Sequence, residues 1–384
     1  MTELWPLPDD PLVPEVRAVA ERLRLSERYR ELDREPAFPR EEFRALGAAG
    51  LLGLTIPREL GGRALPPSRA AVLLFHLGYL GGTAFAKLAL QPEFSSVLRE
   101  HGSPELIDRW FRPLVRGEVL VGNQITEPTA GSDAAALRLE AAWSAGGYLL
   151  NGEKSEAAFA LDAEAAIVYG RRPGSSRTEG VSAFLVPQDL VGVRRTAAPL
   201  DLGERWQRRG SVTYENVRVP EDHRIGVEGE AFGYLRKELS RERGLLAAIY
   251  LGVARASWDE TIAHVGSRTA FGRRLSDRQA VAFPLIEDGA ELESTWLFAV
   301  RALRRLEQGD DAGAETSLAK VRAARAALRT LDHAIQFHGG SGYSARYPHE
   351  QRWRDVRSGS LAHGASEVLV GIASRRLWPD PGRR

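Results

Sequence analysis

Two segments of the chain concentrate residues that can bind an anion or a cofactor. Gln124–Asp133 is a run of small, turn-forming and hydroxyl residues, in which Thr126, Gly131 and Ser132 place donors on a turn. Roughly 200 residues later, the segment 336–343 reads Gln-Phe-His-Gly-Gly-Ser-Gly-Tyr. A ligand can approach glycine-rich main chain closely, so each segment could cradle a phosphate-bearing ligand. Taken alone, each could equally be an ordinary turn.

A carboxylate and an arginine motif could supply reacting and anion-binding groups. Glu242 lies in the run Leu-Ser-Arg-Glu-Arg at 239–243, inside a long stretch of helical periodicity. Burial of a carboxylate in a dry site raises its pKa towards neutrality, which suits a general base. The run Arg-Thr-Ala-Phe-Gly at 268–272 offers a guanidinium, which pairs bidentately with phosphate oxygens. The alternatives are a Glu–Arg pair on a solvated helix face and one more surface arginine.

The periodicity of the apolar residues divides the chain into three parts. An N-terminal part shows mostly helical spacing, a middle part alternates short β-prone runs with turns, and helical spacing then returns. Several of the last helices exceed about 20 residues, which favours a bundle. The sequence therefore predicts an α+β fold, mostly α, with a helical domain over 1–120, a β-domain over 121–229 and a helical bundle over 230–384.

The same patterns predict the element bounds. Helices are expected over 15–32, 68–80, 84–101, 104–116, 231–264, 276–307, 313–338 and 364–376. Strands are expected over 148–150, 165–169, 181–186, 191–195 and 212–219. The pair Asn151-Gly152 is typical of a hairpin turn.

Composition excludes several kinds of chemistry. The 52 basic and 51 acidic residues give a net charge of +1, which does not indicate a nucleic-acid partner. There is no cysteine, so thiolate catalysis and disulfides are excluded, and the eight histidines show no metal-ligand spacing. Met1–Pro6 has no leader pattern, and no apolar run approaches the roughly 18 residues that would span a bilayer. The chain is expected to be soluble and cytoplasmic, without a metal or a membrane partner.

The two ligand-binding segments and the order of the three parts resemble the acyl-CoA dehydrogenase family over essentially the whole chain. The resemblance implies an N-terminal helical domain, a middle β-domain and a C-terminal four-helix bundle. It implies FAD between the β-domain and the bundle, with a neighbouring subunit completing the adenine end. A homodimer or homotetramer is therefore expected.

The resemblance assigns roles to residues of the first segment. Thr126 is expected beside the flavin ring. Ser132 is expected beside the phosphate-bearing arm of the thioester ligand, where it would contact both cofactor and substrate.

Two further motifs resemble the parts of the family that bind the dinucleotide phosphates. The first comprises Arg268, Phe271 and Gln279. The second, which in the family reaches the flavin of a partner subunit, comprises Gln336, Gly339 and Gly340. Because that contact is made between chains, the second motif also implies an oligomer.

The family's reaction removes the proton α to a thioester with a carboxylate, while hydride leaves the β carbon for the flavin. Most members carry this carboxylate in a Glu-Gly-Thr triplet, which here reads His-Gly-Ala at 363–365. A minority carries it in a Leu-x-x-Glu-Arg pattern, which 239–243 matches. Glu242 is therefore the expected base and Arg243 a substrate contact. His363 is the less favoured catalytic candidate: a neighbouring polar group, the base of another reaction, or a residue without a role.

The flavin-ring pocket departs from the family pattern. After Lys154 the family's aromatic residue is replaced by Glu156 and its hydroxyl residue by Ala158, and the threonine of the C-terminal triplet becomes Ala365. Phe159 could supply a ring only if the strand slips, and a slip of one residue turns side chains to the other face. Each lost hydrogen bond to the ring costs about 1–3 kcal/mol.

The resemblance implies FAD-dependent α,β-dehydrogenation of an acyl thioester carried by CoA or a carrier protein. An electron-transfer flavoprotein is the expected electron acceptor, and the arginine-rich composition fits secondary metabolism. Two alternatives follow from the departures. One is a flavin-dependent monooxygenase of the same superfamily, and the other is a non-redox or flavin-poor protein that uses His363 and Glu156.

Overall fold

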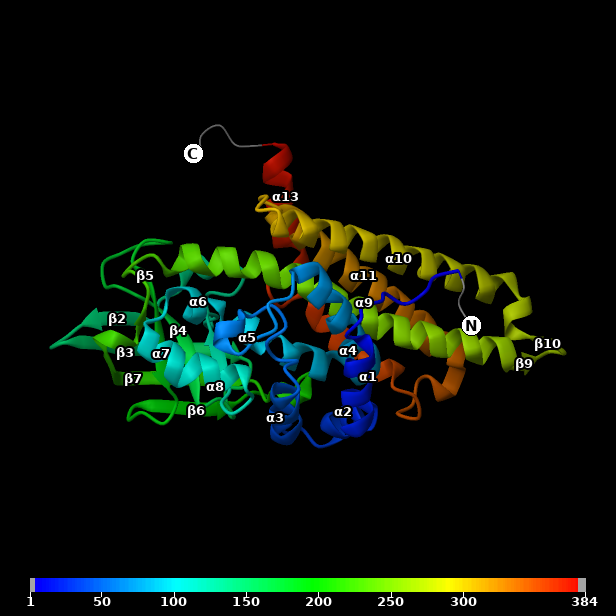
Figure 1. The fold of residues 1–384 in the computed structure, drawn as a ribbon, viewed down its shortest axis with the longest axis horizontal. Coiled ribbons are helices and arrows are strands. Elements are labelled where there is room, and N and C mark those ends of the chain that lie inside the picture. The colour runs from blue at the N-terminus through cyan, green and yellow to red at the C-terminus, as the bar shows by residue number, and fades with distance from the viewer. Residues whose placement is uncertain (1–3, 379–384) are drawn as a thin grey trace.

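The computed structural model describes residues 4–378, and residues 1–3 and 379–384 lie outside it. A β-sheet lies at one end of the molecule, and the long helices of the last part of the chain lie towards the other end (Figure 1). The predicted order of helices, sheet and helical bundle is confirmed. Only part of Met1–Pro6, the segment with no leader pattern, falls within the described residues.

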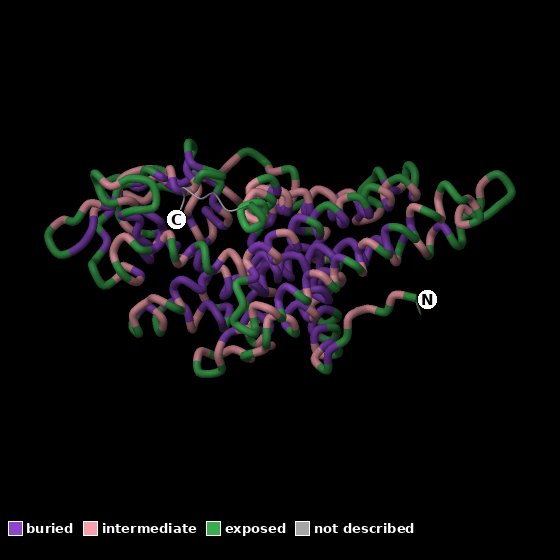
Figure 2. The backbone as a smooth tube through the Cα atoms, turned by 90° about the horizontal axis from the view of Figure 1, so that it is seen from above, coloured by how far each residue is buried: buried purple, intermediate pink, exposed green. Residues whose placement is uncertain are grey.

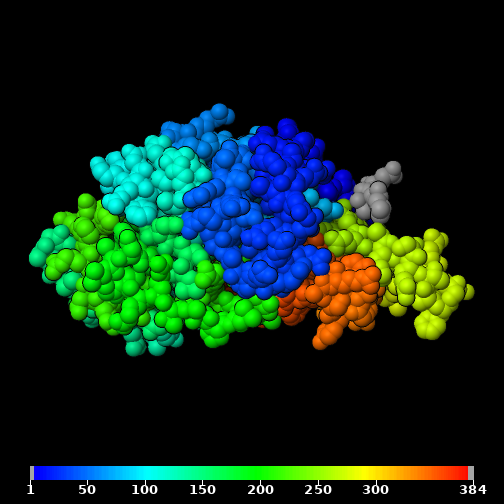
Figure 3. Space-filling view, turned by 90° about the horizontal axis from the view of Figure 1, so that it is seen from below, coloured from blue at the N-terminus to red at the C-terminus, as the bar shows by residue number. Residues whose placement is uncertain are grey.

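Short helices and one long helix make up the first part of the chain. They are α1 (Val13–Arg22), α2 (Leu25–Arg34), α3 (Arg40–Ala48), α4 (Pro67–Ala89), α5 (Gln91–Phe94), α6 (Ser96–His101), α7 (Pro104–Leu106) and α8 (Arg112–Val115). Viewed from below, these helices cover the junction between the sheet and the bundle (Figure 3).

Three expected helix bounds in this part are wrong. The helix expected over 15–32 breaks at Arg24, whose φ is 51°. Periodicity hid the break because apolar residues on both sides of it face the same core. The expected gap before residue 84 is only a kink at Gly82, while the helix expected over 84–101 divides into the end of α4, α5 and α6. A Cβ at Gly82 would lie 2.4 Å from the Tyr29 ring, so the kink allows a close approach that only glycine permits.

One segment is long and apolar enough to cross a membrane, contrary to the expectation from the sequence. Over 67–101 the mean hydropathy of the most apolar window is 1.3, and 83% of that window is buried inside the protein. Much of this burial comes from α4, which packs along α9 (Ala231–Ser267). Burial against other protein elements is typical of a core helix.

The middle part forms one mixed sheet. Its strands are β1 (Val121–Gln124), β2 (Glu140–Trp143), β3 (Gly147–Ala157), β4 (Ala165–Arg171), β5 (Val181–Pro187), β6 (Val193–Ala197), β7 (Gly210–Pro220) and β8 (Arg224–Ile225). The strand order is β6-β7-β3-β2-β4-β5-β8, and β1 pairs with β4 in parallel.

The predicted hairpin turn at Asn151-Gly152 is wrong. β3 runs through this pair, and its pairing with β7 shifts by a bulge between Leu150 and Gly152. The Asn151 side chain accepts a hydrogen bond from the main-chain N–H of Asn216 at 2.8 Å. Cross-strand pairing on both sides of the bulge therefore overrides the local turn preference.

Five helices form the last part. They are α9, α10 (Gln279–Glu307), α11 (Gly313–His338), α12 (His349–Arg357) and α13 (Ser366–Leu377), with a small hairpin, β9 (Thr269–Ala270) and β10 (Arg273–Arg274), between α9 and α10. Of these, α9, α10, α11 and α13 correspond to the expected helices, while α12 was not predicted. The buried residues concentrate where these helices cross α4 (Figure 2).

The helix α9 connects the two ends of the molecule. It begins beside the sheet and ends at the β9–β10 hairpin (Figure 1). At 1.5 Å per residue, its 37 residues extend over about 55 Å. Residues at its two ends therefore serve different sites.

Candidate active site

The two alternative base positions meet in space. His363, just before α13, lies with its Nδ1 2.9 Å from Oε2 of Glu242, on α9. The side chain of Glu242 is 3% exposed and that of His363 is 25% exposed. The sequence left these residues as separate candidates, and the structure joins them as a hydrogen-bonded pair.

Two cations hold the main chain around His363. Nζ of Lys320, on α11, donates to the carbonyls of Ala362 at 2.5 Å and Gly364 at 2.7 Å. Nε of Arg243 donates to the carbonyl of His363 at 3.0 Å. These three bonds hold His363 at a φ of 54°, a conformation that costs a non-glycine residue about 1 kcal/mol or more.

The pair lies in a strongly perturbed electrostatic environment. Burial raises the pKa of Glu242 to about 8, against the opposing effect of Arg241. Burial, together with the charges of Lys87, Lys320 and Arg243, lowers the pKa of His363 to about 3. Both shifts favour the uncharged form of each group, as expected for titratable groups removed from water.

More carboxylates are buried next to Glu242. One turn earlier on α9, Glu238 accepts hydrogen bonds from the Ser96 hydroxyl at 3.2 Å and from the Val97 N–H at 3.4 Å, and burial raises its pKa. Arg241 donates to Glu93, also buried, at 2.7 Å. The alternative that Glu242 lies on a solvated helix face is therefore wrong. Clustered titratable groups with shifted pKa values are typical of functional sites.

The Thr126 loop, expected beside the flavin ring, is anchored to β3 by a buried ion pair. The main-chain carbonyl of Thr126 accepts from the N–H of Ser155 at 2.9 Å. Nζ of Lys154, which is fully buried, donates to Glu127 at 2.7 Å and to the carbonyl of Ile125 at 3.1 Å. Thr126 itself is half-buried, whereas Ser132 further along the loop is exposed.

Glu156, in β3, and Phe159, which follows the strand, lie in different surroundings. Glu156 has a φ of 54° and pairs with Arg209 at 2.9 Å on the surface. Phe159 is buried, with its ring centroid 5.7 Å from that of Phe38 and 5.6 Å from that of Trp206. Phe159 therefore lies in the protein core, and the suggestion that it supplies a ring to the flavin is wrong.

The two motifs expected to bind dinucleotide phosphates come together at the far end of α9. Arg268 ends the helix, Phe271 is 94% exposed in the hairpin that follows, and Gln279 begins α10. The His338 ring stacks on that of His264 at 4.1 Å, which places the turn after α11 beside Arg268. This turn follows Gln336 and contains the last two residues of the motif, Gly339 and Gly340.

The glycines of this far end fit a phosphate-binding turn. Gly339 has a φ of 60°, and a Cβ added at Gly339 or Gly340 would meet nothing within 4 Å. The N–H of Gly339 already donates to the carbonyl of Gln336, and the open space beside both glycines lets a pyrophosphate approach the main chain closely. The part of FAD that these residues would hold is its phosphates.

The predicted cofactor residues thus form two separate sets. Twenty-six positions of α9 separate Glu242 from Arg268, about 39 Å along the helix axis at 1.5 Å per residue. That separation exceeds the length of an extended dinucleotide. Within one chain, a single FAD cannot contact both the Glu242 end and the Arg268 end.

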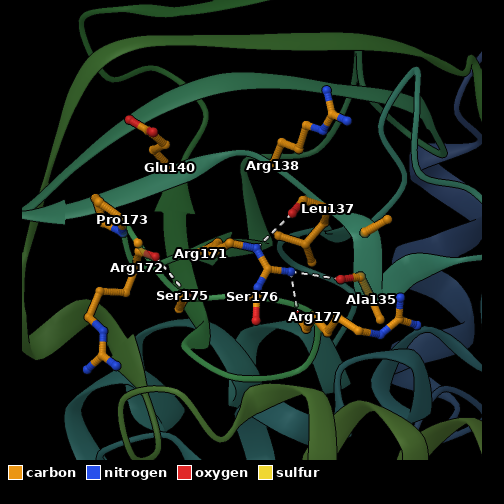
Figure 4. Close-up of a pocket in the computed structure, with 12 residues that line it drawn as sticks. Ala135, Leu137, Arg138, Glu140, Arg171, Arg172, Pro173, Ser175, Ser176 and Arg177 are labelled. Atoms are coloured by element: carbon orange, nitrogen blue, oxygen red, sulfur yellow. Dashed lines mark hydrogen bonds between the residues drawn. The ribbon is translucent and has the colours of Figure 1, made fainter.

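An arginine-rich pocket of about 470 Å³ lies beside the Thr126–Asp133 loop, lined by residues 135–138, 140 and 171–177. Arg171 lies at its centre and donates to the carbonyls of Leu137 at 2.9 Å and Ala135 at 2.8 Å (Figure 4). Arg138 and Arg172 extend away from it on opposite sides (Figure 4). Arg171 therefore shapes the pocket, while Arg138 and Arg172 direct their guanidinium groups towards solvent.

Sequence reasoning missed the residues that support the pair. Lys87 forms a buried ion pair with Glu204 at 2.5 Å and lies near His363, whose ring is also 4.8 Å from that of Phe94. Lys320 was missed in the same way. One signal was available, because lysine is rare in this chain and a retained lysine indicates a specific requirement. Among residues 4–378, no cluster of metal-ligating side chains is present.

Comparison with known proteins identifies the family. Three family models match consecutive parts of the chain: the acyl-CoA dehydrogenase N-terminal domain over 11–118, the middle domain over 122–217 and the C-terminal domain over 229–378. An L-prolyl-[peptidyl-carrier protein] dehydrogenase of Pseudomonas fluorescens is 33% identical over 347 residues, which cover 88% of this chain and 90% of that protein.

Solved structures share the fold over nearly the full length. A glutaryl-coenzyme A dehydrogenase in complex with glutaryl-CoA has a TM-score of 0.90 at 26% identity, covering 97% of this chain and 96% of that one. PigA with FAD and proline has a TM-score of 0.88 at 23% identity, covering 97% and 99%, which shows the fold alone. The chain is a member of the acyl-CoA dehydrogenase family and an oxidoreductase that acts on CH–CH bonds.

Proposed function

We propose that this protein is a FAD-dependent dehydrogenase that introduces an α,β double bond into an acyl thioester. The observation that carries the proposal is the hydrogen-bonded pair of the buried Glu242 and the half-buried His363, which unites both base positions of the family. The pKa of Glu242, raised by burial to about 8, suits a group that accepts a proton near neutral pH.

The residues present fit both the phosphate end and the ring end of FAD. They offer fewer hydrogen-bond donors to the ring than the family pattern does. The open glycines after α11, with Arg268 and Gln279, would hold the phosphates, and Thr126 would lie beside the ring. When bound, the flavin supplies an acceptor for hydride from the β carbon. Ala158 and Ala365 contribute no hydroxyl to the ring.

The chain's own residues hold the acyl group and move a proton. The Glu242–His363 pair accepts the α proton, and Arg243 fixes the carbonyl of His363 beside it. Burial of Glu242 excludes water from the carboxylate, which strengthens its electrostatic interactions.

A phosphate-bearing carrier arm fits the arginine-rich pocket beside Ser132. Arg138, Arg172 and Arg177 line this pocket, and arginine pairs bidentately with phosphate oxygens. Both CoA and a phosphopantetheine-bearing carrier protein present such phosphates. The similarity to a prolyl carrier-protein dehydrogenase favours a carrier-bound substrate, and an electron-transfer flavoprotein is the proposed electron acceptor.

The test combines a spectrum with an anaerobic assay. Protein purified with added FAD is expected to show flavin absorbance at close to one per subunit. It is then expected to dehydrogenate butyryl-CoA, isovaleryl-CoA or a prolyl carrier protein with a dye acceptor and no oxygen. The double variant Glu242→Gln with His363→Asn should bind flavin and remain folded while losing turnover.

Other results would support the alternatives. A colourless protein after reconstitution would contradict the proposal and favour a non-redox function. Product that forms only with oxygen and a reductase would favour hydroxylation.

A further inference from the structure

We infer that His363, through its Nε2, is the group that removes the substrate's α proton, and that Glu242 is a positioning residue that holds the imidazole and balances its charge. The inference rests on the proposed dehydrogenation. It differs from the expectation drawn from the sequence, in which the Glu242 carboxylate contacts the substrate directly.

The two side chains of the pair differ in their exposure to solvent. The Glu242 side chain is 3% exposed, while that of His363 is 25% exposed. Oε2 of Glu242 is engaged by the imidazole. The imidazole therefore offers more accessible surface to a substrate than the carboxylate does.

The hydrogen bond also determines which ring nitrogen is available. Nδ1 of His363 faces Glu242, so an ionised Glu242 fixes the neutral imidazole with its proton on Nδ1. Within the described part of the chain, Nε2 of His363 has no hydrogen-bond partner. The lone pair of Nε2 is then free to accept a proton.

The imidazole is held rigidly, as a base must be. Lys320 and Arg243 fix three consecutive carbonyls around His363, and the Phe94 ring lies against the imidazole at 4.8 Å. A left-handed conformation persists at a non-glycine residue only when its surroundings enforce it. The main chain is thus built to present this one side chain.

The charges around the pair favour the same assignment. His363 is faced by Lys87 from α4, Lys320 from α11, Arg243 from α9 and Glu204 from the segment before β7. The three cations oppose a free imidazolium, so the resting imidazole is uncharged. When Nε2 gains a proton, the nearby Glu242 carboxylate compensates the new charge.

The proton step balances in atoms and electrons. The α C–H bond breaks, its proton forms an N–H bond at Nε2, and its electron pair becomes the new double bond as hydride leaves the β carbon for the flavin. The pair gains one proton and returns it to solvent through the exposed edge of the imidazole.

The inference predicts how rate depends on pH. The pair can accept the substrate's proton only after Glu242 has ionised. Burial raises the pKa of Glu242 to about 8, so this ionisation occurs near pH 8. Arg241 opposes and Glu93 supports this rise. The rate constant should therefore be low below pH 8 and rise as pH increases through about 8.

Two variants distinguish the roles, with butyryl-CoA or the prolyl carrier protein as probe. His363→Asn keeps an amide donor towards Glu242 and tolerates a positive φ, but removes Nε2. It is expected to reduce kcat by about 10²–10⁴-fold, the usual contribution of a general base. Glu242→Gln is expected to lose less and to show a flat profile from pH 5 to 9, because burial and the charges of Lys87, Lys320 and Arg243 lower the pKa of His363 to about 3.

Two further measurements, made at pH 9 where Glu242 is ionised, distinguish the roles, and only the second requires turnover. Histidine-specific ¹⁵N NMR of the full chain, with His363→Asn to identify the signal, should show a neutral imidazole protonated on Nδ1. Free imidazole should restore turnover to His363→Gly and not to Glu242→Gln.

Opposite results would overturn the inference. An Nε2-protonated imidazole, or wild-type turnover in His363→Asn together with none in Glu242→Gln, would make Glu242 the direct base. If wild-type protein turns over no thioester although His363 is protonated on Nδ1, the proposed function fails and the geometry of the pair stands.

Discussion

Lysine is rare in this chain, and three of its four lysines are buried at the segments that carry the site. Of 52 basic residues only Lys87, Lys154, Lys237 and Lys320 are lysine. Lys87 lies near His363, Lys154 anchors the Thr126 loop, and Lys320 holds two carbonyls beside His363. A compact ammonium with three rotatable donors can reach carbonyls that lie on different sides of it. Lys320 uses that geometry to hold the carbonyls of Ala362 and Gly364.

Removing Lys320 should loosen the segment that presents His363. Lys320→Met leaves the carbonyls of Ala362 and Gly364 without their donor, at a cost of about 1–3 kcal/mol for two partly buried hydrogen bonds. Chemical denaturation should show this loss, and kcat should fall while flavin content stays unchanged.

Lys237→Met is the matched control. Lys237 is 73% exposed and pairs with Glu100 at 3.1 Å on the surface. Its substitution should change the free energy of unfolding by less than about 0.5 kcal/mol. Equal effects of the two variants would contradict the role given to Lys320.

At the level of elements, the sequence pattern predicted those helices and strands whose bounds depend mainly on neighbouring residues. The long helices after Gly229 and the strands β4 and β5 lie close to their expected bounds, because apolar periodicity records which face is buried. The predicted turn at Asn151-Gly152 is wrong because β3 pairs with the preceding strand β2 on one side and with the distant strand β7 on the other. The contact between Glu242 and His363 spans 121 residues, and no local pattern specifies it.

The loop 126–139 depends on a buried ion pair that ties it to β3. Lys154→Met would leave the Glu127 carboxylate buried with only the N–H groups of Arg138 and Leu139 as donors. Breaking one side of a buried pair costs about 3–5 kcal/mol. We expect that loss in chemical denaturation, together with faster amide hydrogen exchange over 126–139.

Two comparisons test this prediction. Adding Glu127→Gln to Lys154→Met should recover part of the lost stability, because no unpaired charge then remains buried. Asp133→Asn in the same loop breaks only an exposed 3.6 Å pair with Arg177 and should be nearly neutral. A strictly additive double variant would show that the two residues do not interact.

At the scale of the whole molecule, α9 separates the two sets of cofactor residues. Glu242 lies in the half of α9 that begins beside the sheet, and Arg268 lies at the other end, next to the β9–β10 hairpin (Figure 1). The sequence indicated the base motif and the phosphate-binding motifs, but it did not give the distance between them. That distance follows only from the structure, which shows that α9 is one continuous helix. We therefore propose that a complete FAD site is formed by two copies of the chain.

This arrangement predicts that two inactive variants complement each other. Arg268→Ala removes charge-assisted hydrogen bonds to phosphate, worth about 1.5–3 kcal/mol, and should leave sites largely empty at limiting FAD. His363→Asn fills with flavin but lacks the proton acceptor. In a hybrid of the two, one site carries both defects and its counterpart carries neither. Hybrids purified through two different tags should regain about half the turnover per dimer of the wild-type protein, although each parent alone is inactive. A site built within one chain would leave the hybrid as inactive as its parents, because every site would then carry one defect.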